Sequence, residues 1–128
     1  MTDLRLRLSS TVLGTPDPRG LGAFYRALLS WDLREEHDEW VVLKPPGGTT
    51  GLAFQLETDH QPPTWPSGPG DQQMQAHLDI GASDLDAGVA RALELGAVEA
   101  EFQPQDDVRV MLDPAGHPFC VFQDRASP

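Results

Sequence analysis

The order of predicted elements in this chain indicates an α+β fold made of two tandem βαβββ modules, each a strand, a helix and three further strands. This order occurs twice, once in each half of the 128 residues. Matching features also recur at constant spacing, because Ser10 and His77 are 67 positions apart, as are Asp17 and Asp84. Neither half is long enough to bury its own sheet easily, so we expect a single domain over residues 1–128.

The first module is expected over about residues 9–56. A β-prone run at 10–13 is followed by Asp17, a suitable helix N-cap, and Pro18, a suitable first helical residue. Apolar residues then recur with helical periodicity at Leu21, Phe24, Tyr25, Leu28 and Leu29. Three strands are expected after this helix, at 33–36, 40–44 and 51–56.

The second module is expected over about residues 75–123, after a polar, Pro- and Gly-rich connector at 57–74. A strand at 77–80 is followed by Ser83 and Asp84, which can cap a helix. One face of this helix carries Leu85, Val89, Ala92 and Leu93, and Gly96 is expected to end it in a left-handed conformation. The last strands are expected at 98–102, 108–112 and 119–122, with a tight Asp-Pro-Ala-Gly turn at 113–116.

Charge and composition limit the partners and the compartment. Nine basic against twenty acidic residues give a net charge of -11, which disfavours nucleic acid and anionic membranes and attracts cationic ligands. No apolar run is long enough to span a bilayer, and no secretory signal is recognisable. The single cysteine, Cys120, fits a reducing cytoplasm, and the preference for arginine over lysine suggests a bacterial source.

Several motifs in order give the chain a family resemblance. They are Asp17 before Phe24-Tyr25, His77-Leu78-Asp79, Asp84-Leu85-Asp86 through Leu95-Gly96-Ala97, and Asp113-Pro114-Ala115-Gly116-His117-Pro118-Phe119. The pattern resembles the vicinal oxygen chelate superfamily of glyoxalases, bleomycin-resistance proteins and extradiol dioxygenases, specifically its glyoxalase-like domains. The resemblance implies that the modules form a curved, half-open mixed sheet around a pocket, and that two copies associate as a homodimer.

The resemblance also implies where a metal would bind in metal-dependent relatives, with one ligand from the first and one from the last strand of each module. Those positions correspond here to Ser10, Gln55, His77 and Cys120, and Gln55 and Cys120 are 65 positions apart. Only His77 is a typical ligand of that family, and no carboxylate offsets the charge of an ion. We therefore expect no resident metal or other cofactor, with a divalent metal as the alternative.

Individual side chains leave alternatives open. His77 is either a ligand or general base, or a strand histidine that hydrogen-bonds a neighbour. Trp65, held between prolines, is either a lid over a ligand or a staple that packs the connector onto the sheet. Trp40 and Phe54 either line the pocket face or point away from it, depending on strand register. Cys120 is expected to be a buried neutral thiol rather than a nucleophile.

The turn at 113–116 is expected to be structural, with Asp113 accepting backbone N–H bonds and His117 capping the turn or lying on the surface. The function we expect is small-molecule binding of the glyoxalase/bleomycin-resistance type, with Ser10, Gln55, His77, Trp65 and Cys120 as ligand-binding residues. The alternatives are a metal-dependent lyase, isomerase or dioxygenase using His77, a metal-free enzyme with His77 as base, and a module without a working pocket.

Overall fold

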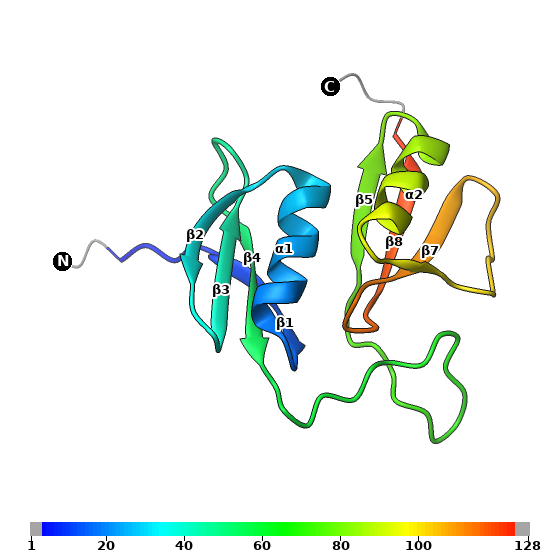
Figure 1. Ribbon diagram of the computed structural model, residues 1–128, viewed down its shortest axis with the longest axis horizontal. Coiled ribbons are helices and arrows are strands. Elements are labelled where there is room, and N and C mark those ends of the chain that lie inside the picture. The colour runs from blue at the N-terminus through cyan, green and yellow to red at the C-terminus, as the bar shows by residue number, and fades with distance from the viewer. Residues whose placement is uncertain (1–3, 125–128) are drawn as a thin grey trace. The chain divides into compact units, whose positions relative to one another are not determined.

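The chain folds into two compact units, residues 1–58 and 59–128, and the computed structural model describes residues 4–124. Each unit contains one helix and one four-stranded mixed sheet (Figure 1). This confirms the predicted α+β fold of two βαβββ modules. Within the described part of the chain, neither helix has the length and apolar character needed to span a membrane.

The first module has its strands in the order β1-β4-β3-β2, with β1 parallel to β4 and the other pairs antiparallel. Its elements are β1 (Ser10–Thr15), α1 (Pro18–Leu29), β2 (Asp32–Glu36), β3 (Trp40–Lys44) and β4 (Gly51–Leu56). The predicted strands at 10–13, 33–36, 40–44 and 51–56 all lie within these bounds or overlap them closely. Parallel β1 and β4 need a crossover, which α1 and the β2–β3 hairpin supply.

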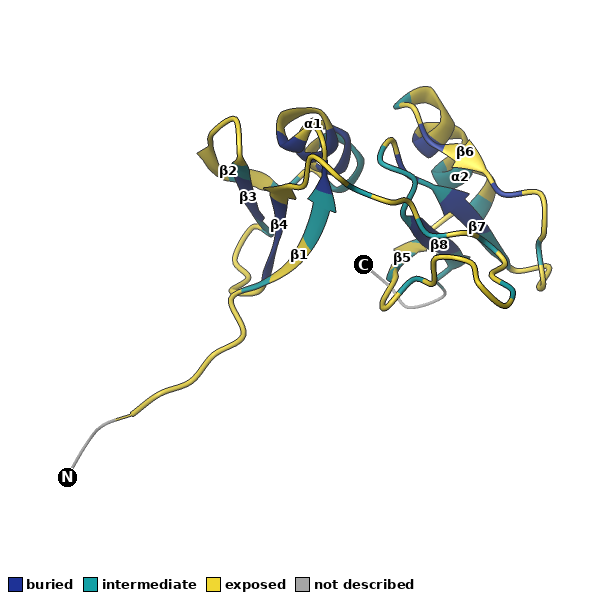
Figure 2. Cartoon of the chain, turned by 90° about the horizontal axis from the view of Figure 1, so that it is seen from below, coloured by how far each residue is buried: buried dark blue, intermediate teal, exposed yellow. Residues whose placement is uncertain are grey.

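Helix α1 begins as predicted, with Pro18 as its first residue and the Asp17 carboxylate accepting a 3.0 Å bond from the N–H of Gly20. Its apolar face packs on the sheet, and the Tyr25 ring stacks on Phe54 with centroids 5.8 Å apart (Figure 2 shows this face buried). Phe54 therefore points to α1 and is fully buried, which excludes it from the opposite, helix-free face of the sheet.

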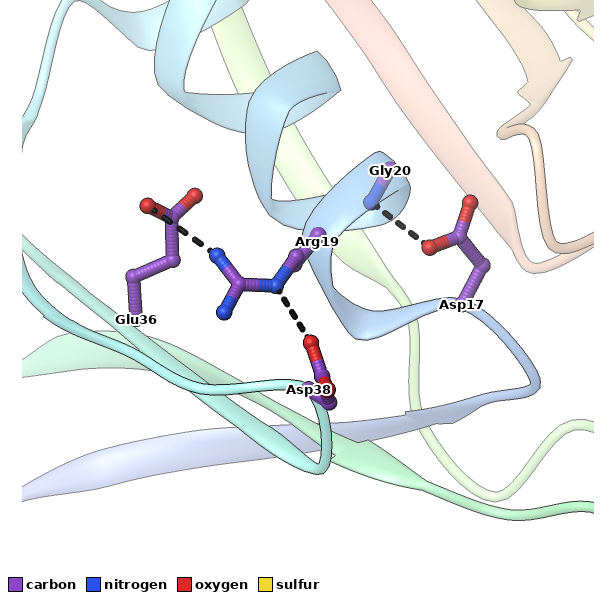
Figure 3. A network of polar contacts seen from close by, with 5 residues as sticks. All are labelled: Asp17, Arg19, Gly20, Glu36 and Asp38. Atoms are coloured by element: carbon purple, nitrogen blue, oxygen red, sulfur yellow. Dashed lines mark hydrogen bonds and ion pairs between the residues drawn. The ribbon is translucent and has the colours of Figure 1, made fainter.

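The first turn of α1 is tied to the turn between β2 and β3 through Arg19 (Figure 3). The Arg19 Nε lies 2.8 Å from Asp38 Oδ1, and its Nη1 lies 3.3 Å from Glu36 Oε1. The hydrogen bond to Asp38 raises the pKa of Arg19 above its ordinary value. All three side chains are solvent-exposed, so this network contributes little to the stability of the module.

The second module repeats the topology with strand order β5-β8-β7-β6. Its elements are β5 (Leu78–Ala82), α2 (Leu85–Glu94), β6 (Val98–Glu99), β7 (Val108–Leu112) and β8 (Pro118–Gln123). Asp84 caps α2 by accepting from the N–H of Ala87, and Gly96 follows the helix with φ of 115°, both as predicted. Of the four residues expected on one face of α2, Ala92 is fully buried and Leu93 is 46 % exposed.

Strand β6 is shorter than the expected 98–102: the N–H of Ala100 still donates to the Val110 carbonyl at 3.0 Å, but the other bonds to Val110 on this side come from a side chain. The Gln103 amide donates to the carbonyls of Ala100 and Val110, at 2.8 and 2.9 Å. Its carbonyl accepts from the N–H of Val110 at 2.8 Å. These bonds satisfy the edge of β7 where residues 100–102 were expected to pair with it.

The parallel strand pairs of the two modules, β1–β4 and β5–β8, share one register. Ser10 is the partner of Gly51 and Leu78 the partner of Phe119, so parallel partners lie 41 positions apart in both modules. The bounds of β4 and β8, Gly51–Leu56 and Pro118–Gln123, also differ by 67 positions, like the helix caps. With that offset, Gln55 is equivalent to Phe122 rather than to Cys120. The predicted equivalence of Gln55 and Cys120 is therefore wrong. It combines an offset of 67 between β1 and β5 with an offset of 65 between β4 and β8, whereas the observed parallel pairing requires the same offset for both.

Candidate functional site

A pocket of about 230 Å³ lies on the helix-free face of the second module's sheet. Phe119 and Val121 of β8 are buried, and Val121 faces Gly88 of α2. Strand alternation therefore turns Cys120 and Phe122 to the opposite face. The lining includes Trp65, His77, Asp79, Val110, Cys120 and Phe122. Three of the five predicted ligand-binding residues, His77, Trp65 and Cys120, thus meet at one pocket.

Strand β5 brings a histidine and a carboxylate together at this pocket. His77 directly precedes β5 and Asp79 follows two positions later, so both side chains leave the same face. The His77 Nε2 lies 3.0 Å from Asp79 Oδ1, with side chains 38 % and 63 % exposed. Asp79 was not among the predicted site residues. The period-two spacing in His77-Leu78-Asp79 is the signal that could have identified it.

Cys120 is the register partner of Asp79 in the β5–β8 pair and is half-buried. Burial raises the pKa of the Cys120 thiol, and the neighbouring Asp79 carboxylate raises it further. A raised pKa keeps the sulfur protonated near neutral pH. The free thiol is therefore a weak nucleophile, which fits the neutral thiol expected from the sequence.

Trp65 packs the connector onto the second module, as in the staple role left open by the sequence, and its role as a lid over a ligand stays a prediction. Its indole N–H donates to the Phe102 carbonyl at 3.2 Å, and the two rings lie 6.4 Å apart between centroids. These contacts anchor the connector to the segment after β6, while the ring also lines the pocket. The peptide bond from Trp65 to Pro66 is cis. The hydrogen bond and the ring contact with Phe102 hold the indole of Trp65 against the second module at the pocket.

Ser10 and Gln55 do not come together within the first module. Ser10 is paired with Gly51, whereas Gln55 is paired with Gly14, four residues further along the same two strands. Four residues of strand correspond to about 13 Å. Gln55 is exposed and its amide donates to Glu57 at 3.1 Å. The four-residue set implied by the resemblance thus lacks both a carboxylate and a converging pair in the first module, and it does not fit a divalent metal.

The turn after β7 is structural, as predicted. The buried Asp113 carboxylate accepts from the N–H groups of Ala115 and His117, at 2.9 and 3.0 Å. Gly116 takes the left-handed conformation that closes this turn, with φ of 86°. The His117 ring lies 4.9 Å from that of His60, whose Nε2 contacts the Ala115 carbonyl oxygen at 2.8 Å. His117 is therefore part of the support for the connector.

A second pocket, of about 480 Å³, lies in the first module between α1 and strands β2 and β3. Its lining includes Gly22, Arg26, Trp31, Leu33 and Glu36, none of which was predicted as a site residue. It holds fewer groups suited to catalysis or metal binding than the pocket of the second module. We therefore take the pocket of His77 and Asp79 as the candidate functional site.

Each βαβββ module pairs its first and last strands in parallel and leaves one face of its sheet free of helix. Two such modules in tandem are the arrangement of the vicinal oxygen chelate superfamily. The glyoxalase-like domain family matches residues 10–122, and the chain belongs to that family. None of the curated proteins gives a significant sequence match. The fold and the family expected from the sequence are both confirmed.

Solved structures with the same fold are distant in sequence. A glyoxalase/bleomycin resistance protein/dioxygenase family enzyme from Burkholderia phytofirmans PsJN has 16% identity and a TM-score of 0.68, covering 92% of this chain and 98% of that one. TnmS3, an antibiotic binding protein from Streptomyces sp. CB03234, has 19% identity and a TM-score of 0.59, covering 96% and 98%. Lactoylglutathione lyase from Agrobacterium tumefaciens has 15% identity and a TM-score of 0.58, covering 91% and 92%. The TM-scores show that these proteins share the fold, and identities this low show the fold alone.

Proposed function

We propose that this protein binds a small organic ligand in the pocket of its second module, without the four-residue metal set of its metal-dependent relatives. The observation that carries the proposal is the composition of that pocket. Trp65, Val110 and Phe122 supply apolar walls, and the His77–Asp79 pair supplies one polar patch among them. Largely apolar walls with a few converging polar groups are typical of small-molecule sites.

The ligand class follows from volume and charge. A pocket of about 230 Å³ accommodates a single ring system with short substituents, or one end of a larger molecule. The Asp79 carboxylate and the net charge of -11 favour a ligand with a positive group, and Trp65 provides an aromatic face for that group. The likeness to an antibiotic binding protein supports a small-molecule ligand, as does the resistance-type resemblance.

Ligand binding is tested by a thermal-shift screen followed by calorimetry on the hits. The screen contrasts aromatic amines with neutral and acidic analogues of the same ring, and the amines are expected to raise the melting temperature most. Trp65→Ala should abolish the shift, whereas Trp31→Ala, in the first module, should preserve it. Equal shifts for amine and acid analogues, or an unchanged shift in Trp65→Ala, would contradict the proposal.

Enzymatic use of His77 is a second candidate, favoured by one observation. The 3.0 Å contact with Asp79 supplies the carboxylate that orients a catalytic imidazole, which the sequence did not reveal. In this reading, His77 removes a proton from a bound substrate and Asp79 holds the imidazole in place. Hydrogen–deuterium exchange at acidic C–H bonds of ligands found in the screen tests it, with His77→Gln as the inactive control.

The proposal includes a cytoplasmic, bacterial protein that associates as a homodimer. Each sheet is open, with β1 and β2 as edge strands in the first module and β5 and β6 in the second. Exposed strand edges are commonly covered by association, which supports a dimer. The single cysteine supports a reducing compartment.

A further inference from the structure

We propose that residues 4–8 of one copy of this chain, here called the arm, add as a strand to the outer edge of β6 in a second copy. The inference assigns surfaces to the homodimer and rests on that part of the proposed function. The arm reads Leu4-Arg5-Leu6-Arg7-Leu8, an alternation of apolar and basic residues that is typical of a strand with one apolar face. It lies outside every helix and strand of its own module.

The apolar face of the arm is left in solvent by its own module (Figure 2). Leu4, Leu6 and Leu8 are 75 %, 87 % and 69 % exposed, more than any other large hydrophobic residue in the described part of the chain. The Leu8 carbonyl accepts from the Thr50 hydroxyl at 3.2 Å, which fixes the end of the arm that leads into β1. Removing three leucines from water is favourable, and an extended apolar stretch of this kind readily pairs with another chain.

Residues 98–102, here called the acceptor edge, carry the complementary alternation. They read Val98-Glu99-Ala100-Glu101-Phe102, with acidic residues at the alternate positions where the arm has basic ones. Val98 and Phe102 are 60 % and 51 % exposed, and both glutamates are exposed as well. A strand added in the register that matches the two faces therefore sets leucines beside apolar side chains and arginines beside glutamates.

The backbone of the acceptor edge is open on the side away from β7, because β6 is the last strand of its sheet. The N–H of Ala100 donates to the Val110 carbonyl at 3.0 Å. The Ala100 carbonyl accepts from the Gln103 amide at 2.8 Å, and that amide also bonds to Val110. Both backbone groups of Ala100 thus face β7, so those of Glu99 and Glu101 point outward. An extended segment can add to an edge of this kind through main-chain hydrogen bonds.

Charge selects a second copy of this chain as the partner. The arm has two arginines and no acidic residue, whereas the whole chain has a net charge of -11. A basic arm is therefore attracted to the acidic surface of another copy. Pairing one arm with another arm would instead place arginine opposite arginine, which is destabilising. In a two-fold dimer each copy gives its arm and accepts that of its partner, so the same contact forms twice.

Charge reversal on each side, followed by mixing, tests the pairing. The acidic-arm variant carries Arg5→Glu and Arg7→Glu, and the basic-edge variant carries Glu99→Arg and Glu101→Arg. Each variant alone should be monomeric by light scattering at a concentration where the unmodified protein is dimeric, because like charges then face each other. An equimolar mixture should regain the dimeric mass, because each arm then finds an edge of opposite charge. Leu6→Ser should weaken the dimer at least about tenfold.

Arg34→Glu is the matched control, because it reverses an exposed arginine of β2 outside the arm and should leave the dimer intact. Circular dichroism checks that each variant is folded, and the arm variants change no helix or strand. A dimer that persists in the acidic-arm variant, or a mixture that stays monomeric, would overturn the pairing and leave the homodimer itself standing. A monomeric mass for the unmodified protein at high concentration would overturn both.

Discussion

Gly22→Ala is expected to destabilise the first module although alanine is the better helix former. A Cβ at Gly22 would lie 2.7 Å from Val41 Cγ1 and 3.5 Å from Phe54 Cδ2, both in the buried interface of α1 with the sheet. The gain in helix propensity is about 1 kcal/mol. Overpacking a close interface costs about 1–3 kcal/mol. Packing therefore outweighs propensity, and we expect a net loss of about 1 kcal/mol in the free energy of unfolding.

Urea unfolding followed by circular dichroism and tryptophan fluorescence measures this loss. Ala23→Gly is the matched control, because Ala23 is exposed at the next position of α1 and reports propensity without packing. Val41→Ala should lessen the effect of Gly22→Ala, so that the double variant is more stable than the sum of the single changes predicts. The reasoning is refuted if Gly22→Ala stabilises the protein by as much as Ala23→Gly destabilises it.

Three further outcomes are expected. Asp113→Ala should lower the free energy of unfolding by about 1–3 kcal/mol, because two backbone N–H groups of its turn lose a buried acceptor; a loss confined to a few tenths would contradict this, as measured by urea unfolding. Cys120 should react slowly with iodoacetamide near neutral pH because its pKa is raised, and Asp79→Asn should speed the reaction by lowering that pKa; an unchanged rate would show that Asp79 has no influence. Light scattering should give a dimeric mass at micromolar concentration, and a monomeric mass at high concentration would exclude the homodimer.

The fold could be predicted from the sequence because its determinants are local. Asp17 and Asp84 are recognisable as N-caps, Gly96 and Gly116 as left-handed residues, and strand periodicity marks most of the eight strands. The end of β6 was missed because the side chain of Gln103 bonds to the backbone of Val110, seven positions further along the chain, where part of the strand pairing was expected. No local pattern distinguishes such a glutamine from an ordinary polar loop residue.

The candidate site was only partly predictable, since it depends on how separate strands are paired. His77 and Cys120 were identified, but their meeting with Asp79 requires the parallel register of β5 and β8. The sequence offset is 67 between Ser10 and His77 but 65 between Gln55 and Cys120. The comparison of offsets alone did not show that Ser10 and Gln55 lie four residues apart along their paired strands. A sheet constrains both strands of a pair at once, which a comparison of single positions does not capture.

Because β1–β4 and β5–β8 share one register, the positions of His77, Asp79 and Cys120 have direct counterparts in the first module. At the common offset of 67, His77, Asp79 and Cys120 fall on Ser10, Val12 and Ala53, and Val12 is the register partner of Ala53 just as Asp79 is of Cys120. The first module therefore has the same frame, occupied by a hydroxyl, an aliphatic group and a methyl. At these three positions the two modules therefore differ in their side chains and not in the pairing of the parallel strands that carry them.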